Sequence, residues 1–116
     1  MRYRDFLTEA WLQLFRGEYS GNRGGGYYTS DREFARQFTQ SGRDHEIKVR
    51  WIRREDIYDP PEPVLAAAST PEKERVWDAA IEEARRQGFK AVRFEEGSGE
   101  PSSVYVFDQS ALRVRP

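Results

Sequence analysis

The chain contains no cysteine and a single histidine, His45. Without thiols, a disulfide framework, a zinc–thiolate site and a cysteine nucleophile are all excluded. One histidine is too few for a histidine-rich metal site, and no Ser-His-Asp pattern surrounds it. We therefore expect His45 to be a surface loop residue, and we predict no metal site.

Long apolar runs and a strong net charge are also missing. No stretch approaches the roughly 20 apolar residues that a membrane-spanning helix needs, and residues 1–5 lack the apolar stretch of a signal peptide. The formal net charge is −1, which gives no general electrostatic attraction to nucleic acid or anionic membranes. We expect a soluble, cytoplasmic protein that acts in its own cell or is delivered into the cytoplasm of a target cell.

Aromatic residues, in contrast, are plentiful. They make up 14% of the 116 residues, whereas disordered chains are poor in aromatics. A chain of this length can bury one core but not two. We therefore predict one folded domain that spans residues 1–116.

Residues 24–30 read Gly-Gly-Gly-Tyr-Tyr-Thr-Ser and form the most informative stretch. The glycines let a backbone or a flat ligand come close to the aromatic residues that follow. Ser30 and Glu33 have the spacing of a capping box, so we predict a strand at 27–29 and a helix over 31–40 with Ser30 as its N-cap. The rings of Tyr27 and Phe38 would then face one another across a slot.

The remaining patterns predict an α+β fold of five or six strands and two or three helices. Ile47, Val49 and Trp51 alternate with charged residues, which is typical of a half-buried strand. Thr70 precedes a proline at the first helical position, and Gly88 follows the last turn, so a helix is expected over 71–87. The other expected elements are a helix at 2–10 and strands at 11–16, 89–94 and 104–107.

Three of these segments together resemble the ADP-ribosyltransferase superfamily, the fold of diphtheria-type toxins, poly(ADP-ribose) polymerases and small phage and toxin domains. In that family the first strand ends in His-Gly or Arg-Gly, and the second carries Gly-x-Tyr-Phe-(Thr/Ala) before a helix with a second aromatic residue. This chain has Arg-Gly at 16–17, Gly-Gly-Tyr-Tyr-Thr at 25–29 and Val-Tyr-Val-Phe-Asp at 104–108. The spacing from Tyr27 to Phe38 is that of the tyrosine-type members.

The resemblance implies split antiparallel sheets flanked by two or three helices, and NAD as a co-substrate. It implies that Arg16 and Gly17 bind NAD, and that Tyr27 and Phe38 enclose the nicotinamide. The other NAD-binding residues implied are Tyr28 and Thr29. The implied activity is mono-ADP-ribosyl transfer to a macromolecular acceptor, protein rather than nucleic acid, and a cognate antitoxin or inhibitor is an expected partner.

One position departs from the family pattern. The family's catalytic glutamate precedes the apolar residues of the last strand, and this chain has Ser103 there. A serine can orient a ribose, but it cannot supply the negative charge that stabilises an oxocarbenium-like transition state. Glu100 is the candidate substitute that we favour, and Glu96 is a weaker one.

Two alternatives remain open from the sequence. A domain of the same fold without catalysis would bind NAD, ADP-ribose or a protein partner, and Ser103 motivates this hypothesis. A small inhibitor or toxin-neutralising protein would act through its surface, and its function would survive replacement of Tyr27 and Phe38 by leucine.

Overall fold

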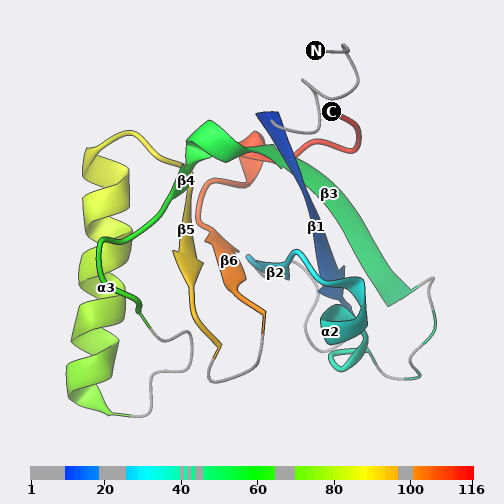
Figure 1. Ribbon diagram of the computed structural model, residues 1–116, viewed down its shortest axis with the longest axis horizontal. Coiled ribbons are helices and arrows are strands. Elements are labelled where there is room, and N and C mark those ends of the chain that lie inside the picture. Colours follow the sequence, from blue (N-terminus) through cyan, green and yellow to red (C-terminus); the bar gives the residue numbers. More distant parts are fainter. Residues whose placement is uncertain are drawn as a thin grey trace.

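The computed structural model describes residues 10–18, 26–39, 41, 43, 46–64, 70–96 and 101–116. Within these residues the fold is α+β, with six strands in one curled mixed sheet and two α-helices (Figure 1). The strand order is β3-β1-β2-β6-β5-β4. The strands are β1 (Trp11–Gly17), β2 (Tyr27–Thr29), β3 (Ile47–Arg53), β4 (Ile57–Tyr58), β5 (Ala91–Phe94) and β6 (Ser103–Val106).

The expected pair of split antiparallel sheets is not what the described residues form. They form a single sheet, and β4 pairs with β5 in parallel. The sheet is nevertheless weakly joined at one place, because β1 and β2 share only the register pair Phe15↔Thr29. The ladders on the two sides of this join are longer. They run from Trp11↔Arg53 to Gly17↔Ile47 on one side and from Tyr27↔Tyr105 to Thr29↔Ser103 on the other.

Both helices pack on the same face of the sheet. Cross-strand partners point to the same face, and the register pairs place Phe15, Thr29, Ser103 and Phe94 in one row across four strands. Helix α2 (Arg32–Arg36) covers the Phe15 end through Ala35, and α3 (Pro71–Arg86) covers the Phe94 end through Trp77. The centre of the row carries two short polar side chains, which leave space between the helices.

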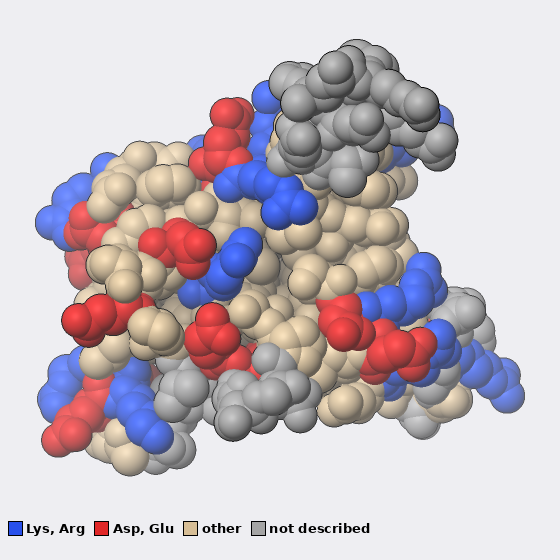
Figure 2. Space-filling model, viewed as in Figure 1, with Lys and Arg blue, Asp and Glu red and all other residues tan. Residues whose placement is uncertain are grey.

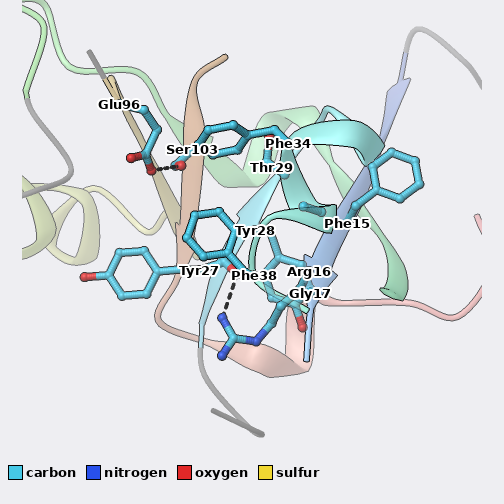
Figure 3. A pocket seen from close by; sticks show the side chains of 11 residues that line it. Phe15, Arg16, Gly17, Tyr27, Tyr28, Thr29, Phe34, Phe38, Glu96 and Ser103 are labelled. Atoms are coloured by element: carbon cyan, nitrogen blue, oxygen red, sulfur yellow. Dashed lines mark hydrogen bonds between the residues drawn. The ribbon is translucent and has the colours of Figure 1, made fainter. Parts of the chain in front are cut away.

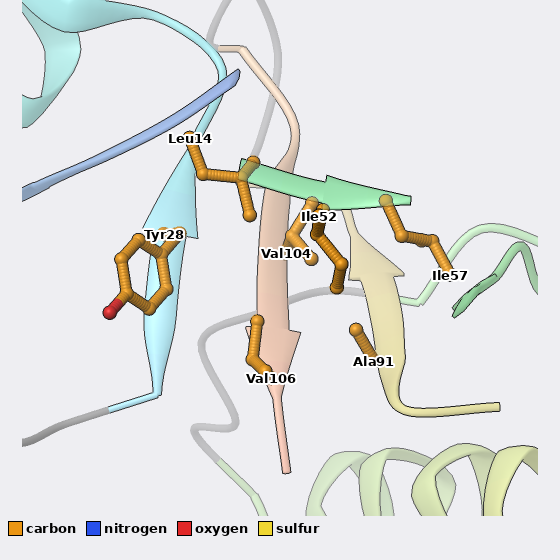
Figure 4. Close-up of a cluster of buried hydrophobic side chains, with 7 residues drawn as sticks. All are labelled: Leu14, Tyr28, Ile52, Ile57, Ala91, Val104 and Val106. Carbon is orange, nitrogen blue, oxygen red and sulfur yellow. The ribbon is translucent and has the colours of Figure 1, made fainter. Parts of the chain in front are cut away.

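The opposite face carries the main core (Figure 4). Because β-strand side chains alternate, Leu14 and Tyr28 point away from the helices, toward Ile52, which is fully buried. The complete cluster is Leu14, Tyr28, Ile52, Ile57, Ala91, Val104 and Val106, with Leu12, Ala111 and Leu112 packed against it. Its members come from both sides of the weak join, so this core holds the two parts of the sheet together.

The sequence patterns are confirmed in type and corrected at several boundaries. Helix α3 begins after Thr70, whose side chain accepts a hydrogen bond from the Lys73 amide, and Gly88 has the expected left-handed φ of 86°. The expected strand at 89–94 begins at Ala91, and the one at 104–107 begins at Ser103 and ends at Val106. Strand β4 was missed because two residues before a proline-rich loop show no periodicity. The helix expected at 2–10 lies outside the described residues except for Ala10.

Helix α2 is shorter than predicted and begins one residue later. Its N-cap is Asp31, whose carboxylate accepts a hydrogen bond from the Phe34 amide at 3.0 Å. The Thr29 hydroxyl oxygen in turn accepts from the Asp31 amide at 3.1 Å. The capping-box pattern at Ser30 was therefore wrong by one position, because an aspartate directly after it is an equally good cap.

This cap gives a direct test. Asp31→Ala is expected to lower the free energy of unfolding by about 1 kcal/mol, the usual cost of losing an N-cap side chain. Ser30→Ala removes a neighbouring exposed side chain that does not cap α2, and is expected to change stability by only a few tenths of a kcal/mol. Urea unfolding of both variants measures the difference. A larger loss for Ser30→Ala would contradict the assignment of Asp31 as the cap.

Candidate functional site

A cavity of about 230 Å³ lies on the helix face, beside the weak join of the sheet (Figure 3). Its floor includes Thr29 and Ser103, both only 4% exposed, which pair across β2 and β6. Large side chains at these two central positions would fill the gap between α2 and α3. The lining residues are Phe15, Arg16, Gly17, Tyr27, Tyr28, Thr29, Phe34, Ala35, Phe38, Glu96 and Ser103.

Gly17 allows α2 to approach this end of the cavity. A Cβ on Gly17 would lie 2.3 Å from the carbonyl oxygen of Ala35 and 2.9 Å from the carbonyl carbon of Phe38. Real Cβ contacts are never this short, so the backbone of the α2 region rests directly on the glycine. Gly17 therefore sets the position of the Phe34 and Phe38 side chains relative to the sheet.

Arg16 lines the cavity, and its guanidinium contacts Tyr27 and Glu18. Its Nη1 donates a hydrogen bond to the carbonyl oxygen of Tyr27 at 2.9 Å, and its Nε lies 3.6 Å from the Glu18 carboxylate. Only 10% of the side chain is exposed. The guanidinium thus links the end of β1 to the start of β2, next to the single register pair that joins these strands.

Tyr27 stands at the mouth of the cavity and also belongs to an aromatic cluster under α3. Its ring is stacked on Trp77, with centroids 5.6 Å apart and planes 20° apart, and it lies 4.9 Å from the Tyr105 ring. Burial raises the pKa of its hydroxyl above the ordinary value of 10.0, and the nearby Tyr105 and Glu96 raise it further. The hydroxyl therefore stays protonated at neutral pH, while the residue is 44% exposed.

Phe38 also lines the cavity. The residue is 49% exposed, and its ring makes an edge contact with Phe34, with centroids 5.4 Å apart. Phe38 follows α2, in a turn in which its amide donates to the carbonyl of Ala35 at 3.1 Å. Figure 3 shows the Tyr27 and Phe38 rings on the same side of the sheet, at the cavity. Both aromatic residues therefore line the cavity, and the Tyr27 ring is stacked on Trp77.

A carboxylate reaches the cavity from the end of β5. The Ser103 hydroxyl donates a hydrogen bond to the Glu96 carboxylate, as drawn in Figure 3. The backbone amide of Glu95 donates to the carbonyl of Val64 at 2.8 Å, which fixes the path of the chain out of β5. Glu95 itself bonds to the Ser102 hydroxyl at 3.3 Å and does not line the cavity.

The predicted site residues divide into three groups. Arg16, Gly17, Tyr27, Thr29, Phe38 and Ser103 are all brought to the cavity. Tyr28 borders it too, but its ring packs in the core of the opposite face, with only 2% of the residue exposed. Glu100 lies outside the described residues.

Sequence reasoning ranked Glu96 below Glu100, and the structure places Glu96 at the cavity. The signal for it was the β5–β6 hairpin: because Phe94 pairs with Ser103, a residue two positions after Phe94 lies close to the start of β6. Such a register cannot be read from either strand alone. It becomes visible only when both strand ends are known.

On the face shown in Figure 2, charged side chains of one sign do not gather at a second site. Figure 2 shows Lys and Arg side chains interspersed with Asp and Glu on the visible face, and a mostly uncharged centre. Among the described residues, no group of three or more His, Asp or Glu side chains is arranged to hold a metal ion. No helix of the described part is long and apolar enough to cross a membrane.

Comparison of the chain with protein-family models, curated proteins and solved structures gives no match. The interpretation of the cavity therefore depends on its own residues and geometry.

The contact at Gly17 predicts a specific loss. Gly17→Ala is expected to cost roughly 1–3 kcal/mol, the range for overpacking a close contact, and to speed amide hydrogen exchange at Ala35 and Phe38 in and after α2. Gly88→Ala is the matched control: it adds the same methyl with nothing within 4 Å, but at a positive φ. It should cost about 1–2 kcal/mol through backbone strain and leave exchange in the α2 region unchanged. Wild-type exchange at these two amides in Gly17→Ala would contradict this account.

Proposed function

We propose that the protein is an NAD-dependent mono-ADP-ribosyltransferase. It would cleave the bond between nicotinamide and ribose and transfer ADP-ribose to a macromolecular acceptor. The observation that supports this proposal is that residues singled out by a sequence resemblance, spread from Arg16 to Ser103, line one cavity. These residues are far apart in the sequence, so their positions in the chain alone do not require them to line the same cavity.

The size of the cavity fits part of NAD. An apolar cavity of about 150 Å³ accommodates benzene, so about 230 Å³ suffices for the nicotinamide ring and a portion of its ribose. The adenosine and the phosphates would then lie outside, along the surface of the protein. In this proposal the nicotinamide ring enters between Tyr27 and Phe38, two half-exposed aromatic residues that both line the cavity.

In this proposal Arg16 stabilises the position of Tyr27 and also contacts NAD. Its guanidinium holds the Tyr27 backbone, and thereby the position of the Tyr27 ring. Arginine has five N–H donors, so contact with the nicotinamide amide or a ribose hydroxyl can be made in addition to the bond to Tyr27. Loss of Arg16 would affect both the join of β1 to β2 and the binding of NAD.

Glu96 takes the role that the resemblance gives to a glutamate at position 103. As the bond between ribose C1′ and the pyridinium nitrogen breaks, its electron pair stays with the nitrogen and neutral nicotinamide leaves. Positive charge develops on the ribose, and a fixed carboxylate stabilises it. The acceptor nucleophile then bonds to C1′ and loses its proton to solvent. Ser103 would position Glu96 through their hydrogen bond.

The alternative function is an NAD- or ADP-ribose-binding module without catalysis. Ser103 at the glutamate position favours it, because the Glu96 carboxylate comes from another strand and is already bonded to that serine. The alternative predicts saturable binding of NAD without release of nicotinamide.

Release of nicotinamide from labelled NAD by the purified protein tests the proposal. Glu96→Gln keeps the shape of the side chain and removes its charge, so the rate is expected to fall roughly 100- to 1,000-fold, as for loss of one preorganised electrostatic contact. Glu95→Gln, which alters the adjacent carboxylate outside the cavity, should retain the wild-type rate. Glu100→Gln is included to separate the two candidate carboxylates.

Each outcome of this assay is decisive. Release that collapses only in Glu100→Gln would transfer the catalytic assignment to Glu100. Binding of NAD without release from the wild type would replace the transferase with the binding module. If NAD neither binds nor reacts, the proposed function is wrong.

A further inference from the structure

We propose that the cavity is selective for a planar organic cation, and that Glu96 determines this selectivity in binding, before any chemistry. The intended occupant is the positively charged pyridinium ring of oxidised NAD, so this inference rests on the proposed function for its ligand. It goes further because it predicts discrimination between charged and neutral forms of the same ring.

The charges at the cavity support this inference. Of the lining residues, Arg16 and Glu96 carry formal charges at pH 7. The Arg16 charge is balanced by Glu18, 3.6 Å away. Glu96 accepts a hydrogen bond from Ser103 but forms no ion pair with any residue that the structure describes. Within the described part of the chain, the negative charge of Glu96 at the cavity wall is therefore not balanced by a cationic side chain.

The aromatic walls favour the same class of ligand. Faces of aromatic rings attract cations, with larger effects where water is excluded. One wall residue already makes such a contact, because the Arg32 guanidinium lies 5.2 Å from the centre of the Phe15 ring. Arg32 does not line the cavity and is exposed, so solvent screens its charge. The exposed parts of the Tyr27 and Phe38 rings remain available at the mouth.

The position of the carboxylate relative to the rings completes the argument. Glu96 is close enough to Tyr27 to raise the pKa of its hydroxyl, and it is bonded to Ser103 on the cavity floor. A flat cation that contacts Tyr27 would thus also lie near the carboxylate. A neutral ring of the same shape would gain the aromatic contacts but not the attraction between charges.

The test compares 1-methylnicotinamide, a cation that cannot release ribose, with neutral nicotinamide. Binding is followed by tryptophan fluorescence, because Trp77 stacks on Tyr27, and is checked by calorimetry. The wild type is expected to bind the cation roughly tenfold more tightly than nicotinamide. Glu96→Gln should bring this ratio close to one, whereas Glu95→Gln should preserve it.

Three results would overturn the inference: equal affinities in the wild type, a preference that survives Glu96→Gln, or no binding of either compound at millimolar concentration. A third ligand, methylguanidinium, distinguishes the pyridinium from an arginine side chain, and tighter binding of methylguanidinium would reject the pyridinium as occupant. Because neither nicotinamide compound is turned over, the result is independent of the release assay. A preserved cation preference with no cleavage of NAD would reject the transferase and retain the cation site.

Discussion

The structure depends on how β1 is joined to β2. These strands share one register pair, Phe15↔Thr29, whereas β1 and β3 are paired along seven residues. So short a ladder cannot hold two parts of a sheet together by itself. The Arg16 hydrogen bond to the Tyr27 carbonyl adds a link at this place, and the core on the opposite face supplies the rest. Leu14 and Ile52 come from one side of the join, and Val104 and Val106 from the other.

The main core and the cavity lie on opposite faces of the sheet, which explains how a chain of this size keeps a cavity. Packing large apolar residues into the gap between α2 and α3 would be favourable by roughly 1.5–3 kcal/mol for each side chain. The chain instead places Thr29 and Ser103 there, while Leu14, Ile52, Val104 and Val106 pack on the other face. Because the core of that face spans the join, stability does not require the helix face to be filled. The aromatic residues that remain on the helix face line the edges of the cavity instead of closing it.

Local patterns in the sequence predicted most elements, because caps, glycines and alternation act over a few residues. Thr70 and Gly88 were correctly read as the ends of α3, and the 27–29 strand and the helix after it were expected near their observed positions. The boundary of α2 was wrong because Ser30 and Asp31 are competing caps. The single mixed sheet was not predictable from such patterns, since strand order and the parallel β4–β5 pair depend on contacts between distant segments.

The position of the Glu96 carboxylate also depends on contacts between distant segments, and local sequence patterns do not predict it. Sequence spacing singled out Arg16, Tyr27 and Phe38, and all three line the cavity. The carboxylate was harder, since the same point in space can be reached from the start of β6 or from the end of β5. Because Phe94 pairs with Ser103, the end of β5 lies next to the start of β6. The carboxylate that lines the cavity therefore comes from the end of β5, and it accepts a hydrogen bond from the Ser103 hydroxyl at the start of β6.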